Sequence, residues 1–204
     1  MTPRLPEGSA ITVTQAGSET VIIVPYAKGG AGRYGILLFM LCWLGGWAFG
    51  EYHAVTELAS GRGGLFVLFW LGAWTLGGAM AAYTVFRIIR GPDPETFNLT
   101  RNSLRYDSGI PPFEINQSYG NSRRNWASYF PKRVRVELDR RKLQSLQLRE
   151  TDLGNRLTID NGSARLDLAS AATEIEREWL YKVLAERYSI EPPKDDATTR
   201  ELAG

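Results

Sequence analysis

Two apolar stretches without a single charged residue constrain the fold of this chain more than any other feature. Residues 34–50 and 65–86 contain no Asp, Glu, Lys or Arg. A helix of about 20 apolar residues is what the ~30 Å hydrocarbon layer of a bilayer requires. The first stretch reaches that length only if its helix continues to Ala54. Because core helices of soluble proteins carry a polar stripe, we expect a transmembrane helical hairpin with spans at about 34–54 and 65–87.

The basic residues beside the two spans predict the orientation of the hairpin. Lys28 and Arg33 precede the first span, and Arg87 and Arg90 follow the second. The connection expected at residues 51–64 carries one Arg against two Glu. Short loops rich in Lys and Arg remain in the cytoplasm. We therefore expect a multi-pass membrane protein whose N and C termini are both cytoplasmic.

Small residues recur at every fourth position in both spans. Lipid provides no hydrophobic force between helices, so close backbone approach and van der Waals contact must hold them together. Two stripes of small residues would allow that approach in an antiparallel hairpin. The predicted helix-packing seam comprises Cys42, Gly46, Gly50, Ala54, Ala73, Gly77 and Ala81.

The spans also carry four tryptophans. Tryptophan is common at the membrane–water interface, but its large amphipathic ring also favours contacts with other helices or with a flat ligand when it lies well inside a span. We therefore expect a contact with a partner in the membrane through Trp43, Trp47, Trp70 and Trp74.

After the second span the sequence changes to the two-residue alternation of β-strands. Turn residues at 101–103 separate two such runs and predict a hairpin, and residues 134–138 alternate apolar with charged side chains. Further strands are expected at residues 113–115 and 143–148. Asn161-Gly162 between two alternating runs gives the strongest hairpin signal, because both residues tolerate the positive φ of a tight turn.

A single helix is expected to close this part of the chain. Thr173 and Glu176 fit a capping box, and apolar residues then recur at helical spacing as far as Tyr188. Ahead of the first span, residues 10–24 predict a pair of strands that can pack against or join the later sheet. The expected parts are an N-terminal arm (1–33), the hairpin (34–90), a β domain (92–190) and a polar tail (191–204).

The middle of the β domain is rich in basic residues with few acids nearby. The net charge of the whole chain is only +2, and no nucleic-acid-binding motif accompanies these cations, so we expect no nucleic-acid partner. Anionic lipid headgroups, an acidic protein surface and bulk solvent remain as three alternatives for this face. The residues are Arg123, Arg124, Lys132, Arg133, Arg135, Arg140, Arg141 and Lys142.

An irregular segment, residues 116–130, mixes aromatic residues with arginine. Exposed aromatics beside arginine are typical of protein–protein interfaces, whereas buried aromatics would simply complete the core of the domain. The candidate interface aromatics are Tyr119, Trp126, Tyr129 and Phe130.

One Cys and one His exclude a disulfide framework, a zinc cluster or an iron–sulfur site within a single chain. The remaining combination, Glu51, His53 and Glu57, falls in the connection expected outside the membrane. These three residues could bind a metal, but acids beside a lone histidine at a membrane surface are usually solvated. We therefore expect no metal, no cofactor and no catalytic residue.

Several of these motifs together carry a resemblance. A hairpin with a Gly- and Trp-rich second helix, short strands, the run Arg-Leu-Thr-Ile-Asp-Asn-Gly at 156–162 and Glu-Arg-Glu-Trp-Leu at 176–180 resemble a group of uncharacterised bacterial membrane proteins. The likeness covers about residues 20–190. It implies an α+β membrane protein whose soluble part is a PH-like domain, an antiparallel β sandwich or barrel with one C-terminal helix. No functional residue carries over by position.

The resemblance implies an interaction module rather than a catalyst, because some proteins of this broader class are similar to assembly factors of photosynthetic or respiratory membrane complexes. We expect a non-catalytic accessory, structural or assembly subunit of a larger complex in the bacterial inner membrane, with other integral membrane subunits as partners. One alternative is a stand-alone module that senses lipids or regulates at the membrane surface. The other is a membrane enzyme with a metal bound in the outer connection.

Overall fold

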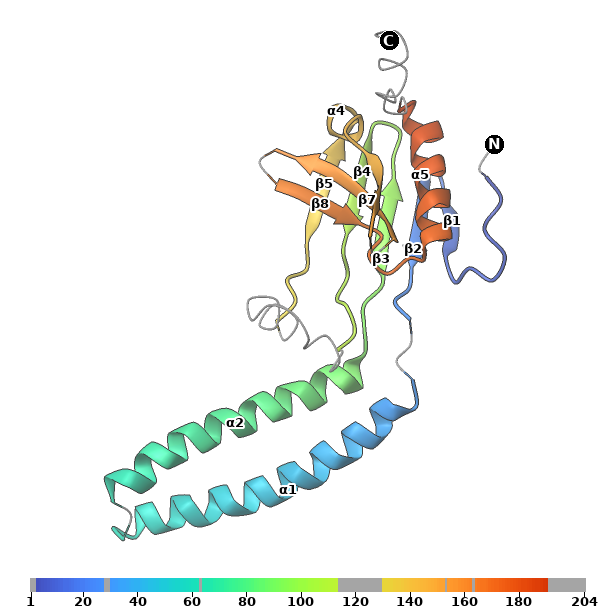
Figure 1. Ribbon diagram of the computed structural model, residues 1–204. Coiled ribbons are helices and arrows are strands. Elements are labelled where there is room, and N and C mark those ends of the chain that lie inside the picture. The colour runs from blue at the N-terminus through green and yellow to red at the C-terminus, as the bar shows by residue number, and fades with distance from the viewer. Residues whose placement is uncertain are drawn as a thin grey trace. The chain divides into compact units, whose positions relative to one another are not determined.

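The computed structural model describes residues 3–27, 30–62, 64–113, 130–152, 154–162 and 164–190. Figure 1 shows its helices and strands, which together give an α+β protein. They are β1 (Thr12–Ala16), β2 (Glu19–Val24), α1 (Gly32–Ala59), α2 (Leu65–Arg90), β3 (Glu95–Leu99), β4 (Ser103–Asp107), β5 (Arg135–Asp139), α4 (Arg140–Leu143), β6 (Gln147–Thr151), β7 (Gly154–Asn161), β8 (Ala164–Leu168) and α5 (Glu174–Tyr188).

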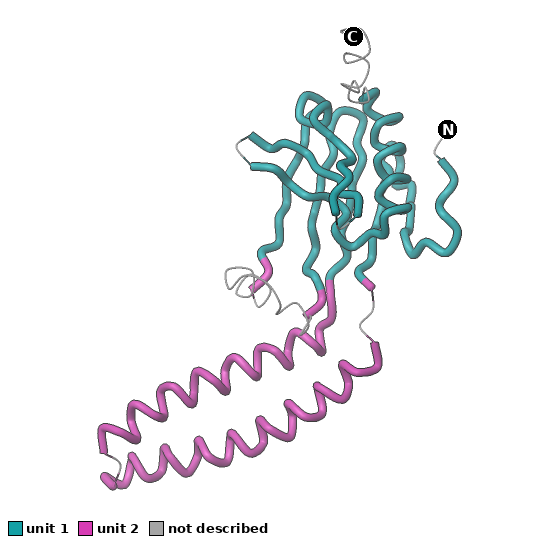
Figure 2. The backbone as a smooth tube through the Cα atoms, in the orientation of Figure 1, with its two compact units in different colours: residues 1–26, 93–111, 132–204 teal, residues 27–92, 112–131 magenta. Residues whose placement is uncertain are grey.

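The chain forms two compact units, drawn in different colours in Figure 2. Residues 1–26, 93–111 and 132–204 make up the β unit, and residues 27–92 and 112–131 make up the helical unit. The helical hairpin is therefore an insertion into the β unit, between two strands that pair with each other. The sequence left open whether the N-terminal strands pack against the later sheet or join it, and in the structure they join it.

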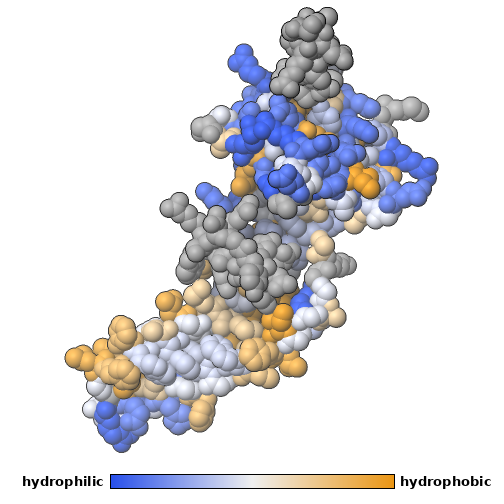
Figure 3. Space-filling model, viewed as in Figure 1, coloured by the Kyte–Doolittle hydropathy of each residue, from blue (hydrophilic) through white to orange (hydrophobic). Residues whose placement is uncertain are grey.

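Helices α1 and α2 run antiparallel and are both long and apolar enough to cross a membrane. None of the described residues of α1 is buried, and hydrophobic residues cover much of the visible helical surface in Figure 3. The hydrophilic colour gathers at the end of the hairpin that carries the short connection and over the β unit.

The connection between the helices is shorter than predicted. We expected the first span to end at about Ala54, with the connection within residues 51–64, but α1 continues to Ala59, so Glu51, His53 and Glu57 are all helical. Residues 51–59 contain no Gly or Pro that would stop a helix. The helix ends just before Gly61, which adopts φ = +76°, a backbone conformation that favours glycine.

The β unit contains two antiparallel sheets within the described residues. One has the strand order β1-β2-β3-β4-β5 and the other β6-β7-β8. β2 and β3 pair across the inserted hairpin, with Ile22 opposite Phe97. Alternate residues of both strands are buried, as expected for strands with one face on a core.

Helix α5 packs mainly against β7 and β6 of the three-stranded sheet. It begins with the predicted capping box, in which Thr173 and Glu176 each bond the backbone N–H of the other. Its inner face buries Trp179, Leu180 and Leu184 in the core. Fully burying a large apolar side chain contributes about 1.5–3 kcal/mol, so these residues hold the helix on the sheet.

One detail of the strand prediction was wrong, and another lies mostly outside the described residues. The segment expected as a strand at 143–148 begins with Leu143, the last residue of α4, and only its last two residues belong to β6, which begins at Gln147. The Asp139 carboxylate accepts a hydrogen bond from Lys142 N–H at 2.9 Å and thereby caps α4. Of the strand expected at residues 113–115, Phe113 lies outside the β-strands and the other residues lie outside the described part of the chain.

Candidate functional site

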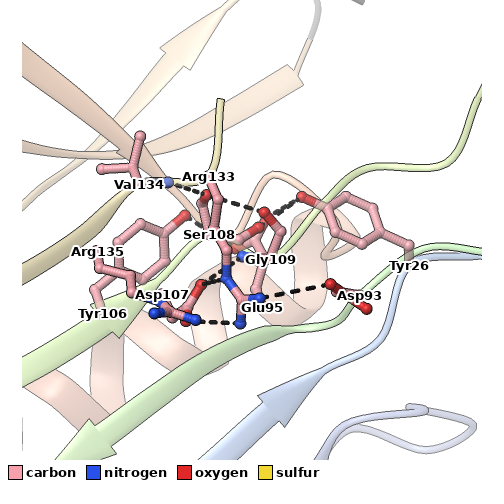
Figure 4. A network of polar contacts seen from close by, with 10 residues as sticks. All are labelled: Tyr26, Asp93, Glu95, Tyr106, Asp107, Ser108, Gly109, Arg133, Val134 and Arg135. Atoms are coloured by element: carbon pink, nitrogen blue, oxygen red, sulfur yellow. Dashed lines mark hydrogen bonds and ion pairs between the residues drawn. The ribbon is translucent and has the colours of Figure 1, made fainter. Parts of the chain in front are cut away.

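A polar network connects the segments through which the chain leaves the β unit and returns to it (Figure 4). Its first centre is Asp107, the last residue of β4. Arg133 Nε donates to Asp107 Oδ1 at 2.7 Å, and Arg135 Nε donates to Oδ2 at 2.8 Å. The hydrogen bond from Arg133 is the main reason why the pKa of Asp107 falls to about 2. Partial burial raises this pKa, but the hydrogen bonds from Gly109 N–H and Arg135 lower it further.

The second centre is Glu95, a fully buried carboxyl group at the start of β3. The Ser170 hydroxyl and the backbone N–H of Ala171, at 3.1 Å, both donate to its Oε1. The hydroxyls of Tyr26 and Tyr106 lie 3.1 Å and 3.3 Å from its two oxygens. Burial raises the pKa of Glu95, although all four hydrogen bonds act in the opposite direction.

Burial also dominates the titration of the tyrosines in this network. It raises the pKa of Tyr26 to about 12 and raises that of Tyr106 as well. The nearby Glu95 adds to both shifts. Both phenols are therefore hydrogen-bond donors at neutral pH, and the hydrogen bonds of Glu95 clamp separate chain segments together.

The four tryptophans predicted to contact a partner lie together between α1 and α2. Trp47 Nε1 donates to the backbone oxygen of Trp74 at 3.0 Å. The ring of Trp70 stacks on that of Trp74 with centroids 4.7 Å apart, and the ring of Trp43 lies 6.5 Å from it. Trp47 and Trp74 are half-buried, whereas Trp43 and Trp70 remain 40% and 38% exposed. Only the latter pair leaves a large surface for a partner.

The structure does not bring the seven residues of the predicted seam together. Cys42, Gly46, Ala73 and Gly77 are exposed, whereas Gly50 and Ala54 are half-buried and Ala81 is buried. Positions four apart on a helix rotate by about 40° per step, because a turn has 3.6 residues. Four residues at this spacing therefore turn away from the face that contacts the other helix. The half-buried residues of α1 instead recur at alternating spacings of three and four residues.

Glycine contributes to the helix contact by accommodating tryptophan rather than another small residue. A Cβ atom on Gly78 would lie 1.9 Å from Cε2 of Trp47, and one on Gly50 would lie 3.6 Å from Cζ2 of Trp74. Among the described residues nothing lies within 4 Å of the corresponding positions at Gly46 and Gly77. Gly78 was absent from the predicted seam, since it does not fall on the four-residue spacing.

The three residues considered as metal ligands do not converge. Glu51 Oε1 lies 2.6 Å from Thr75 Oγ1 of α2. The ring of His53 packs on that of Phe49 at 4.4 Å, and Glu57 pairs with Arg62 at 3.0 Å. No cluster of three or more metal-ligating side chains occurs among the described residues. The structure therefore gives no support to a metal enzyme of this kind.

The described residues of the predicted basic face divide into those bound to a polar side chain and those that are exposed. Besides the two arginines on Asp107, Lys142 Nζ donates to Asn161 Oδ1 at 2.9 Å. Lys132, Arg140 and Arg141 are exposed. Arg123 and Arg124 lie outside the described residues.

Of the candidate interface aromatics, Phe130 is exposed and its ring stacks on that of Tyr83 with centroids 5.2 Å apart. Both residues belong to the helical unit. Tyr119, Trp126 and Tyr129 lie outside the part of the chain that the structure describes.

A cavity of about 520 Å³ lies in the β unit between α5 and the first strands. Apolar side chains such as Ile22, Val183 and Trp179 line it together with Thr20 and Arg187. This volume and mixed lining fall within the range of small-molecule pockets. No local pattern in the sequence indicates this cavity, because its walls come from residues 3–22, Leu99 and residues 179–187, which are far apart in the chain.

Comparisons of the chain with protein-family models, with curated proteins and with solved structures return no match.

Proposed function

We propose that this chain is a non-catalytic accessory or assembly subunit of a larger complex in the bacterial inner membrane. In this proposal α1 and α2 cross the bilayer, and the β unit, of PH-like fold, is a cytoplasmic interaction module. Other integral membrane subunits are the proposed partners. A photosynthetic or respiratory complex is the host suggested by the resemblance described above.

The observation that carries the proposal is the exposed apolar surface of the hairpin. The two helices use one narrow face for each other, and large side chains such as Phe39, Phe49 and Phe69 are two-thirds or more exposed. Contiguous apolar surface of this extent is unfavourable in water and is typical of contacts with lipid or protein. A bilayer with partner helices would satisfy it.

The charge distribution supports the proposed orientation. Because the helices are antiparallel, Arg33 near the start of α1 and Arg87 and Arg90 at the end of α2 belong to the same end of the hairpin. Positive charges at that end favour its retention in the cytoplasm. The β unit connects to the same end, so both termini would be cytoplasmic.

The test uses the full chain in its native membranes. We expect it to resist alkaline carbonate extraction and, after mild detergent solubilisation, to migrate on blue-native gels well above its own 22.8 kDa. Replacing the exposed indoles Trp43 and Trp70 with Leu should weaken this association. Phe66→Leu, at an exposed position near the start of α2, is the matched control. Release of the chain from the membranes by carbonate would contradict the membrane assignment. If all of the detergent-solubilised chain migrated as a free monomer, the subunit role would be contradicted.

The cavity between α5 and the first strands favours a second candidate, a stand-alone regulatory module that binds a small molecule. Its largely apolar walls, with Arg187 and Glu186 as the charged residues of the lining, would suit a small amphipathic molecule. In that case the chain would behave as a free membrane protein, and Arg187→Gln would impair regulation without changing gel migration.

A further inference from the structure

The cavity between α5 and the first strands contains a buried hydroxyl group. Thr20 lies on the inner face of β2, two residues before Ile22. It is only 4% exposed and lines the cavity. No hydrogen bond joins its hydroxyl to another of the described residues. Because a buried hydroxyl without a hydrogen-bond partner is unfavourable, Thr20 favours an occupant of the cavity that can bond to it.

The polar residues of the lining gather at one end of the cavity. Gln15 lies opposite Thr20 in the pairing of β1 with β2, and Thr20 lies opposite Leu99 in the pairing of β2 with β3. The end of α5 reaches the same row of residues, because the Tyr188 hydroxyl donates to the backbone oxygen of Thr100 at 3.2 Å. The polar side chains at this end are Gln15, Thr20, Glu186 and Arg187.

The other end of the cavity is apolar. Val13 and Ile22 form the next inward-facing pair along β1 and β2, and Trp179 and Val183 precede the last turn of α5. Trp179 Nε1 donates to the backbone oxygen of Pro3 at 3.0 Å, so the segment ahead of β1 is fixed against this end. The apolar lining residues are Pro3, Leu5, Val13, Ile22, Trp179 and Val183.

The charged residues of the lining do not favour a ligand of either sign. Glu186 and Arg187 are neighbours of opposite charge, and both are exposed. Water screens such charges, so each contributes little to binding. The buried polar group that faces the cavity is the uncharged hydroxyl of Thr20. The lining therefore matches a molecule with an apolar body and an uncharged polar head group.

We propose that this cavity is a binding site for a small uncharged amphiphile, an apolar chain that ends in a hydroxyl or amide group. The chain packs against Ile22 and Val183, and the head group forms hydrogen bonds with Thr20 Oγ1 and the Gln15 side chain. This inference names the ligand class of the second candidate function and rests on it for a regulatory role. Binding itself requires neither the membrane placement nor a partner subunit.

The test is a titration of the full detergent-solubilised chain with 1-hexanol, followed by the NMR shifts of the Ile22 and Val183 backbone amides. Equilibrium dialysis sets the free hexanol concentration, so that uptake by the micelles does not affect the comparison. The wild type should saturate. Thr20→Val replaces the hydroxyl with a methyl group and should weaken binding about fivefold through the loss of one hydrogen bond. Thr14→Val, at an exposed position of β1, is the matched control and should bind as wild type.

Hexanoate and hexylammonium have the same chain length as 1-hexanol and test the nature of the head group. Both are charged at pH 7 and should bind more weakly than 1-hexanol at equal free concentrations, because the site offers them no buried opposite charge. Tighter binding of either ion than of 1-hexanol would overturn the uncharged ligand class.

Two further results would overturn the site itself. One is the absence of a saturable shift in the wild type, which would mean that the cavity holds only water. The other is equal affinity of wild type and Thr20→Val for 1-hexanol. Saturable binding by a chain that also migrates within a large complex on blue-native gels would support the site and contradict only the stand-alone role.

Discussion

The Tyr26 hydroxyl lies 3.1 Å from Oε1 of Glu95, and these two residues stand on either side of the inserted hairpin. Tyr26 is the last residue of the β unit before the insertion, and Glu95 begins β3 just after it. Ser170 and Ala171, from the connection between β8 and α5, bind the same carboxyl oxygen. The insertion point is therefore fixed by side-chain hydrogen bonds in addition to the pairing of β2 with β3.

The first prediction concerns the pH dependence of this contact. Because burial raises the pKa of Glu95 from its ordinary 4.5, the folded chain keeps a proton that the unfolded chain loses. The free energy of unfolding should therefore fall as pH rises from about 4.5 to the folded pKa. Hydrogen exchange of β3 and β4 amides in the detergent-solubilised chain, corrected for intrinsic rates, should show this fall in wild type and not in Glu95→Gln. The same dependence of the free energy of unfolding on pH in wild type and Glu95→Gln would contradict this prediction. Glu150→Gln, at an exposed position, is the control and should behave as wild type.

Asp107 should have the opposite pH dependence. Its pKa is lowered to about 2 from 3.8, so its contribution is present above about pH 4 and is lost as pH falls towards 2. Since both arginine partners are partly exposed, solvent screening limits the contribution to about 1 kcal/mol. Asp107→Asn should reduce hydrogen-exchange protection of β4 and β5 by that amount at pH 7. Asp160→Asn, which breaks a single exposed pair with Arg165, should have a smaller effect, and equal effects would contradict the assignment.

The elements that the sequence predicted correctly are those whose signals are local. The capping box of Thr173 and Glu176 and the strand pair predicted within residues 10–24 depend on neighbouring residues, and both occur in the structure. The pairing across Asn161 also forms, although Asn161 itself is the last paired residue of β7, opposite Ala164. There the turn follows the asparagine instead of including it.

The candidate sites were harder to predict because they depend on contacts between distant residues. The clamp at Glu95 requires Tyr26 and Ser170 to meet across the insertion and the whole second sheet. Glu51 follows directly on the charge-free run and was assigned to the connection between the spans, whereas the helix in fact continues to Ala59, just before Gly61. No pattern on α1 alone could show that Thr75 lies opposite this charge.

Two exposed cations at the start of α4 lead to a prediction about partner binding. Arg140 and Arg141 are exposed, so replacing both with Gln should change the stability of the β unit by less than about 0.5 kcal/mol. If this surface binds an acidic partner, the double variant should migrate as a smaller species on blue-native gels at physiological salt. Arg133→Gln, in contrast, should destabilise the unit more than this double variant does, through the loss of its bonds to Asp107. Unchanged migration of a folded Arg140/Arg141 variant would exclude these residues from the interface.

The packing of α1 against α2 can be tested by comparing alanine substitutions at the two neighbouring positions Gly77 and Gly78. A methyl group on Gly78 would overlap the indole of Trp47, at 1.9 Å from Cε2, whereas one on Gly77 would meet no described atom within 4 Å. Trp47 cannot simply rotate away, because its Nε1 donates to the Trp74 backbone oxygen at 3.0 Å. Overpacking of this kind costs about 1–3 kcal/mol, so Gly78→Ala should separate the helices and shift the tryptophan fluorescence at lower SDS fractions in mixed micelles. Gly77→Ala should follow the wild-type curve, and if the two alanine variants behaved alike, the contact between Trp47 and Gly78 would not hold the hairpin together.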